Sequence, residues 1–495
     1  RKPHQVGLRY EGSEWTYHQL NSWSSQIASG LIRAGLKPGD RCLLMMQSSP
    51  EFVAGYYALA KIGATVIPVN FLYKSHELQH ILKDSDARGF MGMAPFLDEA
   101  RRVLSERPEV TVRIAAGVTN DPDFLPLRGL KGAESSDPFP ARDEDTAAIL
   151  YTSGTTGKPK GAMLTHENLR SNAQTVADMR QTDPEDCVLG VLPLYHIYGQ
   201  TSVLNASIYL GLTLHLFRSF EPAALKAAIT DTPRTILIAV PTIFNRLLAE
   251  AETNGLQRSS LRFCISGGSS LPVTILRRFE SRYQTRIYEG YGLTECSPVC
   301  VENPFGKTTK PGSIGLPIPG FQARIVDEAG TELESGQVGE LLVKGPGVMK
   351  GYLNQPEITA QTVVDGWLHT GDLARRDQDG YITIVDRKKD LIIRGGYNVY
   401  PREVEEVLFE HPEVVEAGVF GLPEDELGEE IAAEVVLCPG ASVSEDELRQ
   451  FVKERIAPYK YPRIIRFVRD LPKSHTGKVL KRDLRKKWIE PQTLS

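Results

Sequence analysis

The sequence predicts an α/β protein: a large N-terminal domain of α/β layers with a β-rich subdomain, followed by a small α+β C-terminal domain. Three observations lead to this prediction. At 495 residues the chain is too long to fold around a single hydrophobic core. Over roughly the first 310 residues, short apolar runs alternate with longer runs whose apolar residues recur at helical spacing. Beyond that point Gly and Pro become dense and the strand-like runs become short.

The first part of the chain is expected to alternate helices and strands. Thr16 and Gln19 have the spacing of a capping box, apolar residues follow at helical spacing, and Gly35 ends the pattern. Ser49 and Pro50 open the next helix, with Pro at its first position. Apolar runs of strand length lie at 42–46, 65–69, 188–192, 213–217, 235–240 and 262–266. Such alternation is typical of largely parallel sheets covered by helices.

The later part is expected to form two smaller units. Strand-like runs lie at 321–326, 339–344 and 381–385, ahead of the charged run 386–390. Beyond that run we expect a helix at 401–410, strands at 417–420 and 431–437, and a helix capped by Ser444 and Glu447. The final stretch is basic, and we interpret it as a solvated helix end that contains Lys478, Lys481, Arg482, Arg485, Lys486 and Lys487.

These patterns predict the domain boundaries. The N-terminal domain covers residues 1–386, and its β-rich subdomain lies at about 310–386. Residues 387–390 have the composition of a linker, and the C-terminal domain covers 391–495. Because the chain opens at Arg1 in mid-segment, we also expect a short stretch of residues to precede it.

Composition and charge exclude several classes of function. The net charge of −5 and a pI near 6.1 give no reason to expect nucleic acid as a partner. No apolar stretch approaches the roughly 20 residues that cross a bilayer, so no transmembrane segment is expected. The six cysteines are scattered without zinc spacing. We therefore expect free thiols and a cytoplasmic protein, with attachment to a membrane surface as an open alternative.

Residues 151–161, which read YTSGTTGKPKG, form a loop suited to an anion. Its glycines allow successive backbone N–H groups to face one point, and its hydroxyl and ammonium groups add donors. A triphosphate fits such a loop, although a flexible surface turn has a similar composition. The spacing is not that of a Walker P-loop. The run Gly290-Tyr-Gly292 departs from the dinucleotide pattern, because Glu295 stands where the third glycine belongs.

Five motifs in sequence order resemble those of one superfamily. The loop at 151–161 resembles the phosphate-loop signature of the adenylate-forming superfamily, which comprises acyl- and aryl-CoA synthetases, luciferases and peptide-synthetase adenylation domains. Four further matches follow in the family's order: YGLTE at 291–295, WLHTGD at 367–372, DRKKD at 386–390 and PKSHTGK at 472–478. The resemblance covers essentially the whole chain and is closest to the acyl-CoA synthetase and fatty-acid–CoA ligase branch. It implies an ATP-dependent ligase that forms an acyl-adenylate and transfers the acyl group to CoA.

The resemblance assigns residues to the nucleotide and its metal ion. It implies that the phosphates are held by Thr152, Ser153, Gly154, Thr155, Thr156, Gly157 and Lys160. It places around the adenosine Gly267, Gly268, Ser269, Glu289, Gly290, Tyr291, Gly292, Thr294, Asp372 and Arg387. Asp372 would accept hydrogen bonds from the ribose hydroxyls. Glu295, with Thr152 beside it, would help to hold Mg²⁺, which prefers oxygen ligands.

The resemblance also implies a mobile C-terminal domain. Lys478 would bridge the acid carboxylate and the α-phosphate during adenylation, a task that suits a mobile point charge. It would then leave the site as the C-terminal domain rotates about Lys389 in the hinge 387–390. The CoA tunnel would be lined by Gly395, Gly396 and Tyr397. Several relatives carry a basic residue where Ile393 stands, so contacts through that position are not carried over.

The run LPLYHIYG at 192–199 resembles the acid pocket of acyl- and aryl-CoA synthetases. It implies an acid site formed by His196, Tyr198, Gly199, Gly290, Leu293 and Val299, with His196 also a candidate catalytic residue. The small and apolar members suit an aliphatic tail, since each buried methylene contributes about 0.8 kcal/mol. We therefore expect a medium- or long-chain fatty acid, with aryl or cyclic acids as the alternative. The aspartate that amino-acid adenylation domains usually place here is absent from this run.

The residues singled out also have ordinary structural explanations. His196 and Tyr291 would serve as core side chains, Asp372 as a turn residue, and Glu295 as a carboxylate at a helix start. Two functional alternatives stay open: an adenylating enzyme that loads a carrier protein, and a catalytically silent nucleotide-binding protein. The expected ligands are ATP, Mg²⁺, CoA and a small-molecule carboxylic acid. The oligomeric state is left open, with a homodimer among the alternatives.

Overall fold

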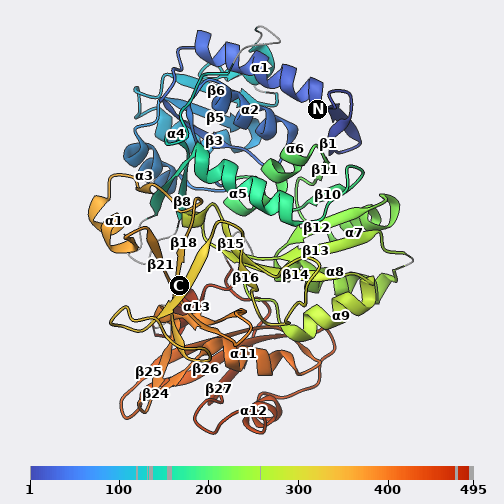
Figure 1. Ribbon diagram of the computed structural model, residues 1–495, viewed down its shortest axis with the longest axis vertical. Coiled ribbons are helices and arrows are strands. Elements are labelled where there is room, and N and C mark those ends of the chain that lie inside the picture. The colour runs from blue at the N-terminus through green and yellow to red at the C-terminus, as the bar shows by residue number, and fades with distance from the viewer. Residues whose placement is uncertain are drawn as a thin grey trace.

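The computed structural model describes residues 2–118, 121–130, 132, 138–152, 159–256, 258–473 and 478–489. Within these residues the strands form four sheets, of nine, eight, five and five strands, with helices packed against them (Figure 1). The predicted α/β class is confirmed. Among the described helices, none combines the length and the apolar character that a bilayer crossing requires.

The eight-stranded sheet has strands that are buried on both faces. Its order is β19-β9-β8-β4-β3-β5-β6-β7. The bounds are β3 Arg41–Met45, β4 Thr65–Pro68, β5 Gly89–Met93, β6 Val112–Ala116, β7 Leu125–Pro126, β8 Thr146–Thr152, β9 Lys160–Thr165 and β19 Gly351–Tyr352. In β3, Cys42 and Leu44 face α1 (Tyr17–Arg33) and α2 (Pro50–Lys61). Leu43 and Met45 face α3 (Ser75–Ser85) and α4 (Leu97–Leu104). Two buried faces explain why this strand is a continuous apolar run.

The nine-stranded sheet shares the core that contains α1 and α2. Its order is β16-β15-β14-β13-β12-β10-β11-β1-β2. The bounds are β1 Val6–Tyr10, β2 Ser13–Thr16, β10 Cys187–Gly190, β11 Thr213–Leu216, β12 Thr235–Ala239, β13 Leu261–Ser266, β14 Ile287–Gly292, β15 Val299–Glu302 and β16 Leu316–Pro317. Its helices are α5 His166–Met179, α6 Ala206–Leu210, α7 Pro222–Asp231, α8 Pro241–Asn254 and α9 Val273–Tyr283. Ligands of parallel sheets bind beyond the carboxyl ends of the strands. His196 follows the carboxyl end of β10, and Gly267 follows that of β13.

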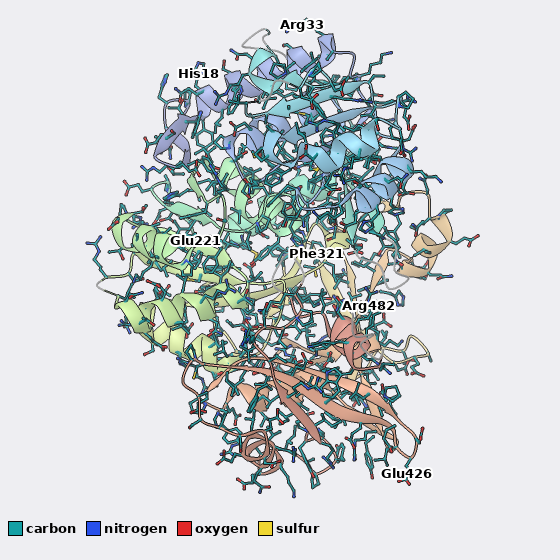
Figure 2. The ribbon with its side chains drawn as sticks, turned by 180° about the vertical axis from the view of Figure 1, so that it is seen from behind. His18, Arg33, Glu221, Phe321, Glu426 and Arg482 are labelled. Atoms are coloured by element: carbon teal, nitrogen blue, oxygen red, sulfur yellow. The ribbon has the colours of Figure 1, made fainter. Side chains whose placement is uncertain are left out.

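Two five-stranded sheets complete the fold. The first contains β17 Gln322–Val326, β18 Val338–Lys344, β20 Val363–Val364, β21 Trp367–Arg376 and β22 Ile382–Arg387, with α10 Pro356–Thr362 nearby. The second contains β23 Ile392–Arg394, β24 Tyr397–Val399, β25 Val414–Glu424, β26 Gly428–Leu437 and β27 Ile464–Phe467. Its helices are α11 Pro401–Phe409, α12 Glu445–Lys453 and α13 Lys481–Ile489. Figure 2 shows Arg482 of α13 at mid-height and Glu426 at the far end of this sheet.

Helix caps read from the sequence are present in the structure. Thr16 Oγ1 accepts a hydrogen bond from the backbone N–H of Gln19 at 3.2 Å, and the Gln19 side chain accepts from the Thr16 N–H at 2.8 Å. Ser444 and Glu447 make the same reciprocal pair ahead of α12. Ser49 caps α2, whose first residue is Pro50. These local signals therefore fix where three of the helices begin.

Two segments are strands because of partners elsewhere in the chain. Strand β9 lies between the loop that follows β8 and helix α5, and it pairs antiparallel with β8. Strand β14 continues to Gly292 and pairs antiparallel with β15, although its last residues include two glycines. A Cβ on Gly292 would lie 1.8 Å from the Pro298 oxygen, so only glycine permits this close pairing. Strand pairing between distant segments therefore overrides the local turn signal.

Polar side chains of helix α5 bind the backbone of two distant segments, residues 346–348 and strand β15. Asn168 Nδ2 donates to the carbonyls of Pro346 and Val348 at 2.7 and 3.0 Å. Asn172 Nδ2 donates to the Val299 carbonyl at 2.7 Å, and its Oδ1 accepts from the Val299 N–H at 3.3 Å. Asn172 is buried, so these bonds satisfy backbone groups of β15 that water does not reach.

Replacement of Asn172 by Ala should destabilise the protein by about 2 kcal/mol or more, because it leaves the N–H and the carbonyl of Val299 buried without partners. The urea midpoint of unfolding measures this loss. Asp178→Ala, at an exposed position of the same helix, is the matched control and should stay within about 0.5 kcal/mol of the parent. Equal stability of the two variants would contradict the role given to Asn172.

Candidate active site

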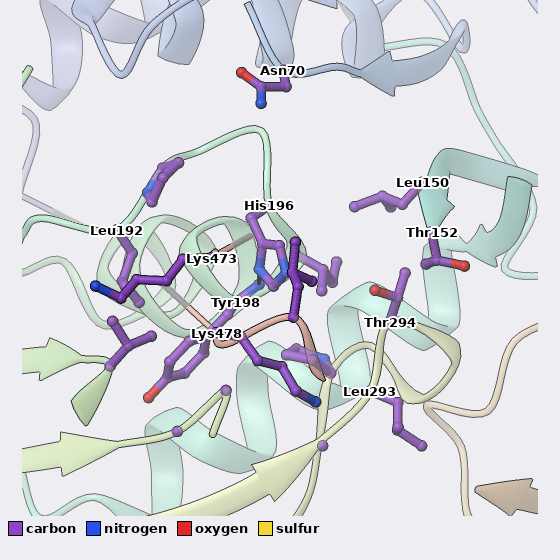
Figure 3. Close-up of a pocket in the computed structure, with 18 of the residues that line it drawn as sticks. Asn70, Leu150, Thr152, Leu192, His196, Tyr198, Leu293, Thr294, Lys473 and Lys478 are labelled. Carbon is purple, nitrogen blue, oxygen red and sulfur yellow. Dashed lines mark hydrogen bonds between the residues drawn. The ribbon is translucent and has the colours of Figure 1, made fainter. Parts of the chain in front are cut away.

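A large cavity lies between the N-terminal and C-terminal parts of the chain. Its volume is about 1280 Å³, and a smaller cavity of about 250 Å³ adjoins it. Figure 3 shows His196, Thr294 and Lys478, which come from three distant segments, around the same space. The candidate residues that line the larger cavity are Thr152, Lys160, His196, Tyr198, Gly267, Gly268, Gly290, Tyr291, Gly292, Leu293, Thr294, Glu295, Val299, Arg387, Lys389 and Lys478.

The ends of the candidate phosphate loop are joined by the β8–β9 ladder. Thr152 and Lys160 are cross-strand partners, and both line the larger cavity. The ammonium group of Lys160 lies 4.5 Å from the centre of the Tyr352 ring. The other candidates for phosphate binding fall outside the described residues: Ser153, Gly154, Thr155, Thr156 and Gly157. The antiparallel pairing thus fixes where the loop leaves and re-enters the sheet.

Glu295 is oriented by a tyrosine that the sequence did not indicate. It lies in the short helical turn Thr294–Cys296 that follows β14. Tyr352 Oη donates to Glu295 Oε1 at 2.7 Å. Burial and the neighbouring carboxylate of Glu295 raise the pKa of Tyr352. The Glu295 carboxylate and the Thr152 hydroxyl supply oxygen ligands of the kind that Mg²⁺ prefers.

Asp372 is held from two sides. Tyr291 Oη donates to Asp372 Oδ2 at 2.5 Å, and Arg387 Nε lies 3.2 Å from Asp372 Oδ1. Asp372 and Arg387 are cross-strand partners on β21 and β22, which explains their approach. Burial and the negative charge of Asp372 raise the pKa of Tyr291 well above its usual value. Tyr291, Asp372 and Arg387 all line the smaller cavity. Its lining also includes Gly268, Ser269, Glu289, Gly290 and Gly292.

Glu289 is a buried carboxyl group in the wall of the smaller cavity. Its Oε1 accepts from the Leu271 N–H at 3.2 Å, whereas its Oε2 has no hydrogen-bond partner among the described residues. Burial raises the pKa of Glu289 to about 7, and the positive charge of Arg402 acts in the opposite direction. The carboxyl is therefore poised to exchange a proton near neutral pH.

Lys478 brings a positive charge from the C-terminal part into the cavity, whose lining also includes His196 (Figure 3). Burial, together with the nearby charge of Arg387, lowers the pKa of Lys478 to about 8, although Asp372 and Asp390 act in the opposite direction. Burial removes the water that would stabilise the ammonium group. A bound anion would stabilise it instead, so the charged form of Lys478 is favoured when an anionic ligand is present.

The charged hinge region is more enclosed than the sequence indicated. Asp386 Oδ2 accepts from the backbone N–H of Arg402 at 2.8 Å. Lys481 Nζ lies 3.0 Å from Glu405 Oε1 and 3.9 Å from Asp386 Oδ1, and its side chain is 17% exposed. The interpretation of Lys481 as part of a solvated helix end is therefore wrong, because two carboxylates draw its side chain inward.

The candidate acid residues fall into two groups. His196 is partly enclosed, its Nδ1 accepts from the Tyr198 N–H at 3.2 Å, and burial lowers its pKa to about 4. It is therefore neutral at pH 7. Leu293 and Val299 line the larger cavity with His196 and Tyr198. Gly199 does not belong to the lining: it begins the π-helical segment Gly199–Asn205, and a Cβ there would lie 2.4 Å from the Pro193 oxygen.

The candidate CoA residues lie away from both cavities. Tyr397 is 59% exposed, and its ring centre is 4.7 Å from that of Tyr459. Gly395 and Gly396 occupy the turn between β23 and β24 with positive φ angles of 56° and 80°. In this arrangement the cavity contains Lys478, and the CoA candidates face outward.

Two family models cover most of the chain. The model of the AMP-binding enzyme matches residues 1–353, and that of the AMP-binding enzyme C-terminal domain matches residues 403–478. The chain belongs to the AMP-binding enzyme family. This confirms the resemblance that the five motifs carry. In this AMP-binding enzyme Lys478 lines both cavities, the larger one with Glu295 and the smaller one with Asp372.

Named relatives of this AMP-binding enzyme include CoA ligases for different acids. The chain is 36% identical to a long-chain-fatty-acid–CoA ligase of Bacillus subtilis, over 98% of this chain and 92% of that protein. It is 35% identical to a feruloyl-CoA synthase of an Amycolatopsis species, over 98% and 96%. Among solved structures, ATP-bound MatB from Rhodopseudomonas palustris is similar, with a TM-score of 0.89, 32% identity, and coverage of 98% and 96%.

Removal of the Tyr352 hydroxyl should leave the Glu295 carboxylate less well oriented, because the hydrogen bond between them is lost. Loss of a partner that orients a metal-binding carboxylate commonly reduces metal affinity tenfold or more. On the expectation that Glu295 holds Mg²⁺, Tyr352→Phe should need roughly tenfold more Mg²⁺ for half-maximal ATP-dependent turnover. Tyr209→Phe, at an exposed position, is the control and should match the parent enzyme. An unchanged Mg²⁺ requirement in Tyr352→Phe would show that Glu295 does not depend on this hydrogen bond.

Proposed function

We propose that this AMP-binding enzyme is an acid–CoA ligase. It joins a carboxylic acid and ATP to give acyl-AMP and pyrophosphate, and then transfers the acyl group to CoA with release of AMP. The observation that carries the proposal is the position of Lys478, which lines the larger cavity with the phosphate-loop flanks and His196 and the adjoining smaller cavity with the Tyr291–Asp372 pair. The names of the relatives, which are CoA ligases of fatty and aromatic acids, support it.

The first half-reaction brings two anions together. A carboxylate oxygen attacks the α-phosphorus, the bond to the bridging oxygen of the β-phosphate breaks, and pyrophosphate leaves with that electron pair. Lys478, in its charged form, would lie between the carboxylate and the α-phosphate and reduce their repulsion. Asp372, oriented by Tyr291 and Arg387, would bind the ribose hydroxyls. Mg²⁺ held by Glu295 and Thr152 would neutralise charge on the departing pyrophosphate.

The second half-reaction requires Lys478 to make room for the thiol of CoA. Residues 1–386 and 391–495 would act as two bodies that rotate about the hinge 387–390, with Lys389 at its centre. Direct polar contacts between the bodies include Asn245 Nδ2 to the Val415 carbonyl at 3.1 Å. Rotation would bring Gly395, Gly396 and Tyr397 from the surface to the cavity. The CoA thiol then attacks the acyl carbonyl, and AMP leaves as the thioester forms.

The acid would carry a largely apolar tail. The lining that includes His196 also contains Val240, Ile265, Leu293 and Val299, and burial of apolar surface against them favours such a tail. A medium- or long-chain fatty acid is the first candidate. An aryl acid is the second, because the feruloyl-CoA synthase relative matches this chain about as well as the fatty-acid ligase does.

A panel of acids tests the proposal. Fatty acids of increasing length and aromatic acids are incubated with ATP and Mg²⁺, and acid-dependent pyrophosphate release is measured with and without CoA. Thioester formation with CoA supports the ligase. Pyrophosphate release with thioester formed only on a phosphopantetheinyl carrier protein would favour the carrier-loading alternative. No acid-dependent pyrophosphate release would contradict the proposal.

Substitution of Lys478 by Ala should separate the two half-reactions. The variant loses the charge that bridges the two anions, so acid-dependent pyrophosphate exchange should fall by about a thousandfold. Conversion of supplied acyl-adenylate to acyl-CoA should be retained, because Lys478 has left the site by then. Equal loss of both activities would contradict the rotation of the C-terminal body.

The pH profile should report the charge of Lys478. Because the pKa of Lys478 is lowered to about 8, the ammonium form predominates below that pH and is lost above it. The value of kcat/KM for pyrophosphate exchange should therefore fall tenfold per pH unit above about 8, since this parameter reports groups of the free enzyme. In Lys478→Arg the guanidinium stays charged, and the decline should disappear. A decline that persists in Lys478→Arg would assign it to another group.

A further inference from the structure

Helix α3 (Ser75–Ser85) has two faces with different surroundings. Leu78 and Ile81 belong to the hydrophobic core that packs on the eight-stranded sheet. The polar residues Glu77, His80 and Asp84 recur at spacings of three and four, so they share a second face of the helix. Glu77 lines the larger cavity. The second face is therefore turned toward the cavity in which ATP would bind.

A hydrogen bond from this face holds one flank of the candidate phosphate loop. His80 Nε2 donates to the Pro159 carbonyl at 2.9 Å. Since a carbonyl oxygen only accepts hydrogen bonds, the imidazole carries a proton on Nε2 in this contact. Pro159 directly precedes Lys160, the candidate phosphate ligand at the start of β9. His80 therefore fixes the backbone from which Lys160 emerges.

A second contact holds the other flank, where α3 lies beside β8 (Figure 1). Asp84 Oδ2 accepts from Tyr151 Oη at 2.8 Å, and the rings of His80 and Tyr151 meet edge to face with their centres 6.2 Å apart. Burial and the carboxylate of Asp84 raise the pKa of Tyr151, so its hydroxyl remains a donor at pH 7. Tyr151 directly precedes Thr152 at the end of β8. Asp84 therefore fixes the backbone from which Thr152 emerges.

Asp84 also contacts the segment that carries Tyr352. Asn354 Nδ2 donates to the Asp84 carbonyl at 2.8 Å and to Asp84 Oδ1 at 3.3 Å. Asn354 lies two residues beyond Tyr352, whose hydroxyl orients Glu295. The two oxygens of one carboxylate thus link the strand that leads into the loop with the segment beside the candidate metal ligand.

We propose that His80 and Asp84 are positioning residues for the triphosphate of ATP. Both contact the flanks of the loop, and neither belongs to the lining of the larger cavity. Thr152 and Lys160 are cross-strand partners, so a single helix holds both strands at the point where the phosphates would bind. This inference rests on the proposed function, since ATP is the nucleotide assigned to the loop. AMP lacks the β- and γ-phosphates and should bind independently of both residues.

Nucleotide binding to His80→Ala tests the contact with Pro159. The affinities for ATP with Mg²⁺ and for AMP are measured by calorimetry without acid or CoA. Loss of the hydrogen bond should weaken ATP binding by roughly fivefold to tenfold and leave AMP binding within about twofold of the parent. His80→Gln keeps an N–H donor and should recover most of the ATP affinity. His76→Ala removes the same kind of side chain from an exposed position of α3 and should match the parent.

A double-mutant cycle tests the other flank. Tyr151→Phe and Asp84→Ala should each weaken ATP binding and leave AMP binding unchanged. If Asp84 acts through Tyr151, the double variant should bind ATP no more weakly than Asp84→Ala alone. Independent residues would give the product of the two effects, which would contradict this path of action.

The two half-reactions give a further readout. Only adenylation uses the triphosphate, so the KM for ATP in acid-dependent pyrophosphate exchange should rise in His80→Ala. Conversion of supplied acyl-adenylate to acyl-CoA should keep the parent rate, because the acyl-adenylate has no β- or γ-phosphate. A purely structural role for His80 would lower both rates together with the urea midpoint of unfolding.

Two results would overturn the inference. The first is an unchanged ATP affinity in both His80→Ala and Asp84→Ala. The second is an equal loss of ATP and AMP affinity, which would make the two residues structural. Because nucleotide binding needs no acid, the ligase function is tested separately. A parent protein that binds ATP but releases no pyrophosphate with any acid would contradict the ligase and leave the positioning roles intact, whereas failure to bind ATP would overturn both.

Discussion

Lys478 belongs to the C-terminal part of the chain, yet its ammonium group lies in the cavity that the N-terminal part builds. The cost of enclosing that charge is partly offset by Asp372 and Asp390 and increased by Arg387. Asp372 accepts a hydrogen bond from Tyr291 and pairs with Arg387, so the same carboxylate interacts with the tyrosine, the arginine and the lysine. The rest of the site depends on this carboxylate. Displacement of the C-terminal part would remove the charge of Lys478 and change the electrostatic surroundings of Asp372 and the side chains that it contacts.

A second group of charges explains how the C-terminal part is held in this orientation. Asp386 stands at the end of the N-terminal part and accepts the backbone N–H of Arg402, while Lys481 lies between Glu405 and Asp386. Burial raises the pKa of Glu405, and Lys481 counteracts the rise. Buried ion pairs of this kind contribute little net stability but strongly disfavour arrangements in which one partner loses the other. The group therefore favours the arrangement of the two parts that the structure shows.

The sequence predicted the fold class and the helix starts because those signals are local. The capping pairs at Thr16 and Ser444 lie within four residues, and so does the Ser49–Pro50 start. The motifs were recognisable because their residues are contiguous. Contacts between distant segments gave no such signal: Tyr352 meets Glu295 across 57 positions, and Arg180 meets Glu302 across 122. Neither strand β9 nor the extension of β14 was predicted from the sequence, since a partner strand elsewhere in the chain creates them.

Helix α5 and the residue that ends it carry Asn168, Asn172 and Arg180, which contact separate segments of the fold. Asn168 contacts the 346–348 segment, Asn172 contacts β15, and Arg180 pairs with Glu302 at the end of β15. Insertion or deletion of a single residue within the helix would rotate everything after it by about 100° and separate these contacts. Variation in α5 is therefore confined to the exchange of side chains at fixed positions, because a change in its length would cost several distant contacts at once.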